Sequence, residues 1–342
     1  MELQITWFIL WSVLWAVYFM LDGFVLGTGM LYYILGKDRQ EKQMLLQTIG
    51  PVWNGNEVWL VTAGGATFAA FPTTYALMFS YLYTALLLLL FALIIRGVSI
   101  ELHSKGEGAS WMKRWDIGIF VGSFLPALLF GVAFGNIFKG LPMDATGYHG
   151  SLLSLLNPYG LLTGALFVIL FLVHGALYIS LKTTGNVAGR AAVIAQKLWI
   201  LELIIAVSFL VYTYFATKLF DNYFAKPILL IIPFIAVAGL LGIKLLSAKG
   251  AMFKAFLSSC CAILFVVFTG VTGLFPNLIP SSLDPGYSMT ITNSSSSHLT
   301  LAVMTVVAFI FVPIVIVYKI WVYRIFRAPV TKESVIQDAS NY

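Results

Sequence analysis

Charged residues are scarce in this chain. Asp, Glu, Lys and Arg make up 10% of the 342 residues, whereas hydrophobic residues make up 60%. Soluble domains carry about 25% charged residues, so this composition excludes a soluble enzyme and is typical of a multi-pass membrane protein surrounded by lipid. The net charge of +6 comes from basic residues scattered over several segments, which excludes a concentrated nucleic-acid-binding surface.

Cysteine and histidine are also rare. The two cysteines, Cys260 and Cys261, are adjacent in an apolar run and match no metal-ligand spacing, so we expect free, buried thiols. Three of the four histidines lie in or near loops: His103, His149 and His298. Only His174 lies deep in an apolar segment, and a single buried histidine is more often a hydrogen-bonded core residue than a haem ligand. We therefore expect no haem, other cofactor or metal to bind this chain alone.

Nine apolar segments are long enough to cross a bilayer, since about 20 residues span its hydrocarbon core. They lie near residues 5–35, 49–71, 73–100, 115–138, 158–181, 191–216, 227–246, 253–275 and 299–326. The first is too long for the apolar region of a signal peptide and should remain as a membrane helix. We predict one all-α membrane domain over residues 1–342. Helices 1–4 fall within 5–138, helices 5–8 within 158–275, an external loop at 276–298, and a cytoplasmic tail at 327–342.

The basic residues indicate the orientation. When the connections are assigned to alternate sides, one side receives 17 of the 20 basic residues, Arg96 among them, and the other keeps Lys139, Lys218 and Lys226. The positive-inside rule then places the N-terminus outside and the C-terminus in the cytoplasm. This orientation requires an odd number of spans, which nine satisfies.

Two carboxylates lie inside the apolar segments of the first hairpin. Asp22 falls in the first segment, and Glu57 falls one helical turn after Asn54 in the second. A charged side chain at the bilayer centre costs roughly 2.5–3.5 kcal/mol, so such residues mark polar interiors, partners or proton paths. We predict that Glu57, Asn54 and Asp22 are steps of a proton path that rises from the cytoplasm. The alternative is that they only hydrogen-bond neighbouring helices.

Other polar residues have simpler interpretations. Asp116 follows basic residues at the expected start of the fourth helix, which indicates a helix cap. Glu202 is near Lys197 and is expected at the membrane interface, and Glu101 is expected to be solvated together with His103 and Lys105. The small residues Gly23 and Gly27, spaced by four, predict close contact between helices.

Several motifs in this chain resemble those of subunit II of the cytochrome bd quinol oxidases. They are LDGF at 21–24, WNGNEVWL at 53–60, TAGGA at 62–66, WDIGIFVGSF at 115–124, GVAFGN at 131–136, LNPYGL at 156–161 and FPN at 275–277. Together they cover most of the chain in the order that the family shows.

The resemblance implies a nine-helix subunit, built from two four-helix bundles and a peripheral helix. It would pair with a homologous subunit I and usually with a small single-helix subunit in a prokaryotic plasma membrane. The complex would oxidise quinol and reduce O₂ to water, with two b-type haems, one haem d and the quinol site all in subunit I. Subunit II would complete the fold and deliver cytoplasmic protons.

One position departs from the family pattern. Many relatives carry Trp-Asp-Gly-Asn-Gln in the second helix, whereas this chain has asparagine at position 54 and glutamate at position 57. We therefore assign the proton-accepting role to Glu57 and Asp22 and do not transfer it to Asn54. Two other function classes stay open: a proton-coupled secondary transporter, which also uses intramembrane acids, and a purely structural membrane partner.

Overall fold

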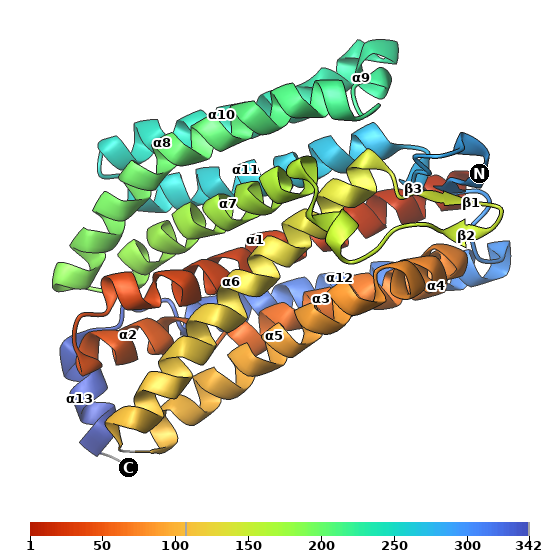
Figure 1. Cartoon of the computed structure of the whole chain (residues 1–342). Helices are drawn as coiled ribbons and strands as arrows, with labels where there is room; N and C mark the ends of the chain where they lie inside the picture. Colours follow the sequence, from red (N-terminus) through yellow and green to blue (C-terminus); the bar gives the residue numbers. More distant parts are fainter. Residues whose placement is uncertain (107, 341–342) are drawn as a thin grey trace.

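Long helices that run roughly side by side form most of the molecule, and the short strands of the described residues lie near the end that holds the N-terminus (Figure 1). The computed structural model describes residues 1–106 and 108–340. The α-helices are α1 (Glu2–Leu35), α2 (Arg39–Ile49), α3 (Trp53–Ala70), α4 (Pro72–Tyr81), α5 (Tyr83–Leu102), α6 (Ala109–Lys139), α7 (Pro158–Lys182), α8 (Gly185–Ala216), α9 (Asp221–Ala225), α10 (Ile231–Ala248), α11 (Met252–Leu274), α12 (His298–Ile325) and α13 (Lys332–Ser340). The predicted all-α class is confirmed.

Short elements connect the helices. The 3₁₀ turns are η1 (His103–Lys105), η2 (Leu153–Leu156), η3 (Pro227–Leu230) and η4 (Pro285–Tyr287). Two antiparallel pairs of strands join β1 (Met143–Asp144) to β2 (Gly147–Tyr148) and β3 (Asn277–Ile279) to β4 (Met289–Thr290). In the first pair, hydrogen bonds from His149 and Thr146 lower the pKa of Asp144 to about 2, so this carboxylate is ionised at physiological pH.

Eight helical segments within the described residues are long and apolar enough to cross a membrane. They contain α1, α5, α6, α7, α8, α10, α11 and α12. The predicted span at 49–71 corresponds to α3, which is not among the eight because two asparagines, a glutamate and three glycines make this 18-residue helix less apolar. The predicted span at 73–100 is divided into α4 and α5 at Leu82.

Local sequence explains where several helices begin. The side chain of Asn157 accepts a hydrogen bond from the backbone N–H of Gly160 at the start of α7, and Ser297 does the same for Thr300 at the start of α12. Pro72 occupies the first turn of α4, where its missing N–H is not needed. α2 was not expected from the sequence, and it starts at a cap made by Asp38.

α1 lies at the centre of the structure and packs against α3, α6, α7 and α11. Two glycines allow the close approach of α1 and α7. A Cβ atom on Gly27 would lie 1.9 Å from the carbonyl oxygen of Phe171, and one on Gly175 would lie 2.6 Å from the carbonyl carbon of Gly27. The predicted contact through Gly23 and Gly27 is confirmed, since a Cβ atom on Gly23 would also meet the Phe171 ring at 2.7 Å.

We expect Gly27→Ala to reduce the amount of folded protein several-fold, because the methyl group would push the backbones of α1 and α7 apart. Overpacking of this kind typically costs about 1–3 kcal/mol. The measurement is the level of protein recovered from membranes in a mild detergent. Gly189→Ala is the matched control, because nothing lies within 4 Å of its Cβ position. Equal recovery of both variants would contradict the packing argument.

Candidate functional site

A buried cluster of three charged side chains joins α1, α3 and α5. The Arg96 guanidinium donates to both carboxylate oxygens of Asp22, over 2.9 and 3.3 Å, and also donates to Glu57. The side chains of Asp22 and Arg96 have no exposed area, whereas that of Glu57 is 25% exposed. The structure therefore brings the two predicted acids together on one cation, and only Glu57 reaches the protein surface.

Arg96 is the member of this cluster that the sequence analysis misplaced. Its assignment to a cytoplasmic connection is wrong, because α5 continues to Leu102 and holds Arg96 six residues before its end. An arginine deep in an apolar segment needs an anionic partner on a neighbouring helix. The long apolar run before Arg96, together with two acids in the first hairpin, could have indicated this pairing.

The predicted role of Asn54 is not supported by its position. Its side chain is exposed and makes no hydrogen bond within the described part of the chain. Asn56, which was not selected as a site residue, is fully buried. Its amide nitrogen donates to the carbonyl of Leu21 over 2.7 Å, and its amide oxygen accepts from the hydroxyl of Tyr323 over 2.9 Å.

Aromatic rings enclose the cluster on the N-terminal side of Asp22. The hydroxyl of Tyr18 donates to Asp22 over 3.3 Å, and the Tyr18 ring is itself fully buried. Phe19 and Phe130 pack edge to face at 5.3 Å between centroids beside it. Of these side chains, that of Glu57 is partly exposed, whereas Tyr18 is fully buried.

A second polar cluster forms where α1, α2 and α6 meet. The carboxylate of Asp116 accepts from the Lys42 ammonium at 2.5 Å and from the Tyr32 hydroxyl at 2.8 Å, and it lies 2.8 Å from the Nε2 atom of His103. The predicted cap at Asp116 is wrong, because α6 begins at Ala109, seven residues earlier. His103 is buried rather than solvated, whereas Glu101 and Lys105 are exposed as expected.

The other predicted polar residues divide into confirmed and corrected cases. His174 is a hydrogen-bonded core residue, as expected: Nδ1 lies 2.9 Å from the hydroxyl of Ser259 and Nε2 lies 3.0 Å from the carbonyl of Met20. Glu202 was expected at the interface but is fully buried, because its face of α8 turns toward the neighbouring helices, and neither of its carboxylate oxygens has a hydrogen-bond partner among the described residues. The two cysteines are free but only partly buried.

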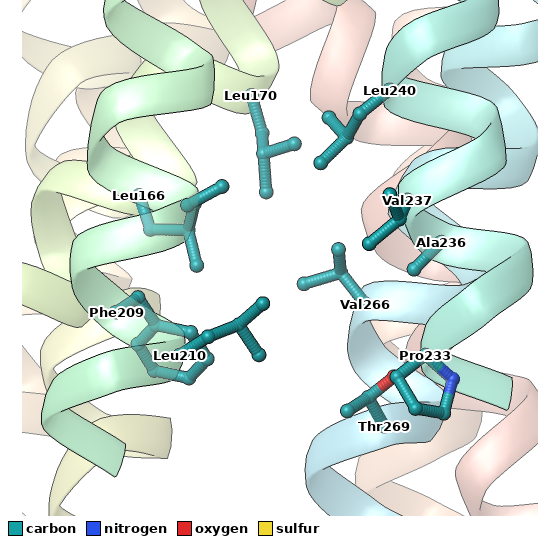
Figure 2. A pocket seen from close by; sticks show the side chains of 11 residues that line it. Leu166, Leu170, Phe209, Leu210, Pro233, Ala236, Val237, Leu240, Val266 and Thr269 are labelled. Carbon is teal, nitrogen blue, oxygen red and sulfur yellow. The ribbon is translucent and has the colours of Figure 1, made fainter. Parts of the chain in front are cut away.

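A small apolar cavity lies away from the charged cluster. It holds about 40 Å³ between α7, α8, α10 and α11, and Figure 2 shows apolar side chains such as Leu166, Phe209 and Val266 turned toward it. This volume is close to that of a water molecule or two and far below that of any organic cofactor. Within residues 1–106 and 108–340, no group of three or more His, Cys, Asp or Glu side chains could hold a metal ion.

Comparisons with known proteins agree with the motifs. The family model described as cytochrome bd terminal oxidase subunit II matches residues 3–326. The chain belongs to this family. It is 35% identical to the cytochrome bd-I ubiquinol oxidase subunit 2 of Escherichia coli K12, over 97% of this chain and 96% of that one. It is 36% identical to the cytochrome bd ubiquinol oxidase subunit 2 of Bacillus subtilis 168, over 96% and 97% of the two chains.

The fold of this subunit II also matches a solved structure. A chain in the structure of bd oxidase from Geobacillus thermodenitrificans superposes with a TM-score of 0.78 at 17% identity, over 95% of this chain and 99% of that chain. The protein is thus a multi-pass membrane subunit of a cytochrome bd-type oxidase in a prokaryotic plasma membrane. Asp22, Glu57 and Asn56 belong to the first hairpin of this subunit II, and Arg96 joins them from α5.

Proposed function

We propose that this subunit II serves a complex that oxidises quinol and reduces O₂ to water, and that it delivers protons from the cytoplasm through Glu57 and Asp22. The observation that supports this role is the buried Arg96 cluster, in which only Glu57 has exposed side-chain area. A carboxylate inside the membrane costs free energy, and such residues mark polar interiors, ion pairs or proton paths. Membership of the oxidase family supplies the reaction that consumes the protons.

The chemistry of the cluster suits transfer of single protons. Arg96 stays charged, so it cannot relay a proton itself, but it holds both carboxylates within reach of one guanidinium. Two carboxylates and one guanidinium sum to a charge of −1, and one added proton makes the cluster neutral. Glu57 accepts the proton at the exposed side, and the shared guanidinium then exchanges hydrogen bonds as the proton passes to Asp22.

The partners follow from the same proposal. A homologous subunit I would carry two b-type haems, one haem d and the quinol site, and a small single-helix subunit would complete the complex. Both ring nitrogens of His174 are engaged in hydrogen bonds, which supports placing the haems in the partner.

We expect the chain produced alone to bind no haem, and the complex purified through a tag on this chain to show haem absorption from its partner. Absorption spectra of the two preparations test this. A stoichiometric haem on the isolated chain that is lost in His174→Ala would contradict the assignment of all haems to subunit I.

The proposed topology has nine crossings, with α3 as the ninth, an external N-terminus and a cytoplasmic C-terminus. We picture helices 1–4 and 5–8 as two bundles and α12 as the peripheral helix. The topology is supported by the division of basic residues between the two sides, which is 17 to 3 with Arg96 and 16 to 3 once this buried residue is removed from the count.

A reporter enzyme fused after Tyr342 should be active only in the cytoplasm, and one inserted near Ser295 should be active only outside. The reverse pattern would refute the orientation and the direction of the proton path. A transporter role is not favoured, because α1 runs unbroken through Asp22, whereas transporters of that class build their midplane sites from interrupted helices.

A further inference from the structure

α12 contacts the region of the charged cluster through two hydrogen bonds to a single asparagine. Most of this helix is apolar and exposed, and it packs against α1 and α3. Lys319 and Tyr323 both donate to the amide oxygen of Asn56, over 3.3 and 2.9 Å. Lys319 is six residues from the end of α12, so its long side chain could extend to the membrane surface. It turns instead toward α3.

Gly55 makes room for the Lys319 ammonium. A Cβ atom at position 55 would lie 2.6 Å from the Lys319 Nζ atom, closer than any van der Waals contact allows. The absence of a side chain at Gly55 therefore allows the Lys319 ammonium of α12 to approach α3. The proton path described above makes no use of this arrangement.

The contact continues to the charged cluster. Asn56 donates to the carbonyl of Leu21, the residue before Asp22, and the Lys319 ammonium lies within electrostatic range of Asp22 itself. The titratable and charged groups that face this site from the surrounding helices are Tyr18, Asp22, Glu57, Arg96, Tyr178, Cys260, Lys319 and Tyr323. Among these groups, Lys319 is the second cation beside Arg96.

We infer that Lys319 is a positioning residue whose positive charge weakens the hold of the Asp22–Glu57 pair on a proton, so that the proton can move onward. This inference rests on the proposed proton delivery. With Arg96 alone the cluster carries a charge of −1 and would retain a proton strongly in apolar surroundings. A second cation nearby brings the ionised cluster close to neutrality, and release becomes possible at the working pH.

Infrared spectroscopy of the purified complex tests this directly, because a protonated carboxyl group has its own C=O stretching band. Any part of this band that disappears in Asp22→Asn or Glu57→Gln is assigned to the carboxyl groups of Asp22 and Glu57. In Lys319→Met we expect the pH midpoint of this band to rise by about one pH unit. Lys332→Met is the matched control, because it removes an equal charge from an exposed lysine that pairs with Asp38, and its midpoint should stay unchanged. An unchanged midpoint in Lys319→Met would overturn the inference.

Gly55→Ala provides a second variant that keeps the charge but displaces the ammonium. We expect a smaller shift in the same direction, and if Lys319→Met does not assemble, an unchanged midpoint in Gly55→Ala overturns the inference. The infrared band is measured without turnover, so proton delivery and the role of Lys319 can be refuted separately. Full turnover in Asp22→Asn and Glu57→Gln would refute proton delivery, whereas slowed turnover in these variants with an unshifted band in Lys319→Met would refute the role of Lys319 alone.

Discussion

Arg96→Gln should remove most of the assembled subunit from the membrane. The substitution leaves Asp22 fully buried with the Tyr18 hydroxyl as its remaining hydrogen-bond donor. Breaking one side of a buried ion pair typically costs about 3–5 kcal/mol, which is a large part of the stability of most proteins. Immunoblots of membranes and thermal denaturation of the detergent-purified complex measure the loss. Normal accumulation of Arg96→Gln would contradict the assignment of a charged, buried cluster.

Two further variants separate charge from general damage. Arg114→Gln removes an exposed arginine of α6 and should leave accumulation unchanged. Combining Arg96→Gln with Asp22→Asn should restore part of the lost protein, because a neutral amide costs less to bury unpaired than a carboxylate does. Arg96→Lys should accumulate little better than Arg96→Gln, since an ammonium cannot present the planar group of donors that contacts both acids.

The second large effect concerns turnover. Asp22→Asn and Glu57→Gln keep the size of each side chain but remove its titrating group. If these acids relay protons, O₂ consumption should fall by about 10²-fold while haem content and assembly persist. Glu57→Gln should slow turnover more at high pH than at low pH, because proton supply limits the rate there.

Glu101→Gln is the matched control for turnover, because this exposed acid lies near the end of the same helix as Arg96. It should respire at the normal rate. Turnover by Asp22→Asn and Glu57→Gln that equals this control at every pH would assign purely structural roles to both acids.

Sequence periodicity was informative where apolar residues determine the structure. The apolar segments predicted the long helices, and the spacing of Gly23 and Gly27 predicted a close helix contact, which the structure forms with α7. The two intramembrane acids were found because their cost in lipid is large whatever their neighbours are. Each of these inferences depends on one segment at a time.

The errors arose where a residue's role depends on a second segment. Arg96 was counted with the basic residues of a cytoplasmic connection because its acidic partners lie on two other helices, which one segment alone does not reveal. Asn54 was selected from its spacing to Glu57 and Asn56 was not considered, because the direction of α3 toward α1 and α12 decides which asparagine is buried. Asp116 was taken for a cap because the fourth helix was expected to start at residue 115, whereas α6 begins at Ala109.

Proton uptake from the cytoplasmic side tests the central claim most directly. Proteoliposomes that hold the oriented complex would receive a pulse of O₂ while a pH dye reports the compartment facing the cytoplasmic surface. We expect uptake in Glu57→Gln and Asp22→Asn to slow about as much as their O₂ consumption, with normal haem content and normal uptake in Glu101→Gln. Uptake at the wild-type rate in the double variant would show that protons enter elsewhere, through the partner subunit, and would contradict the path through this hairpin.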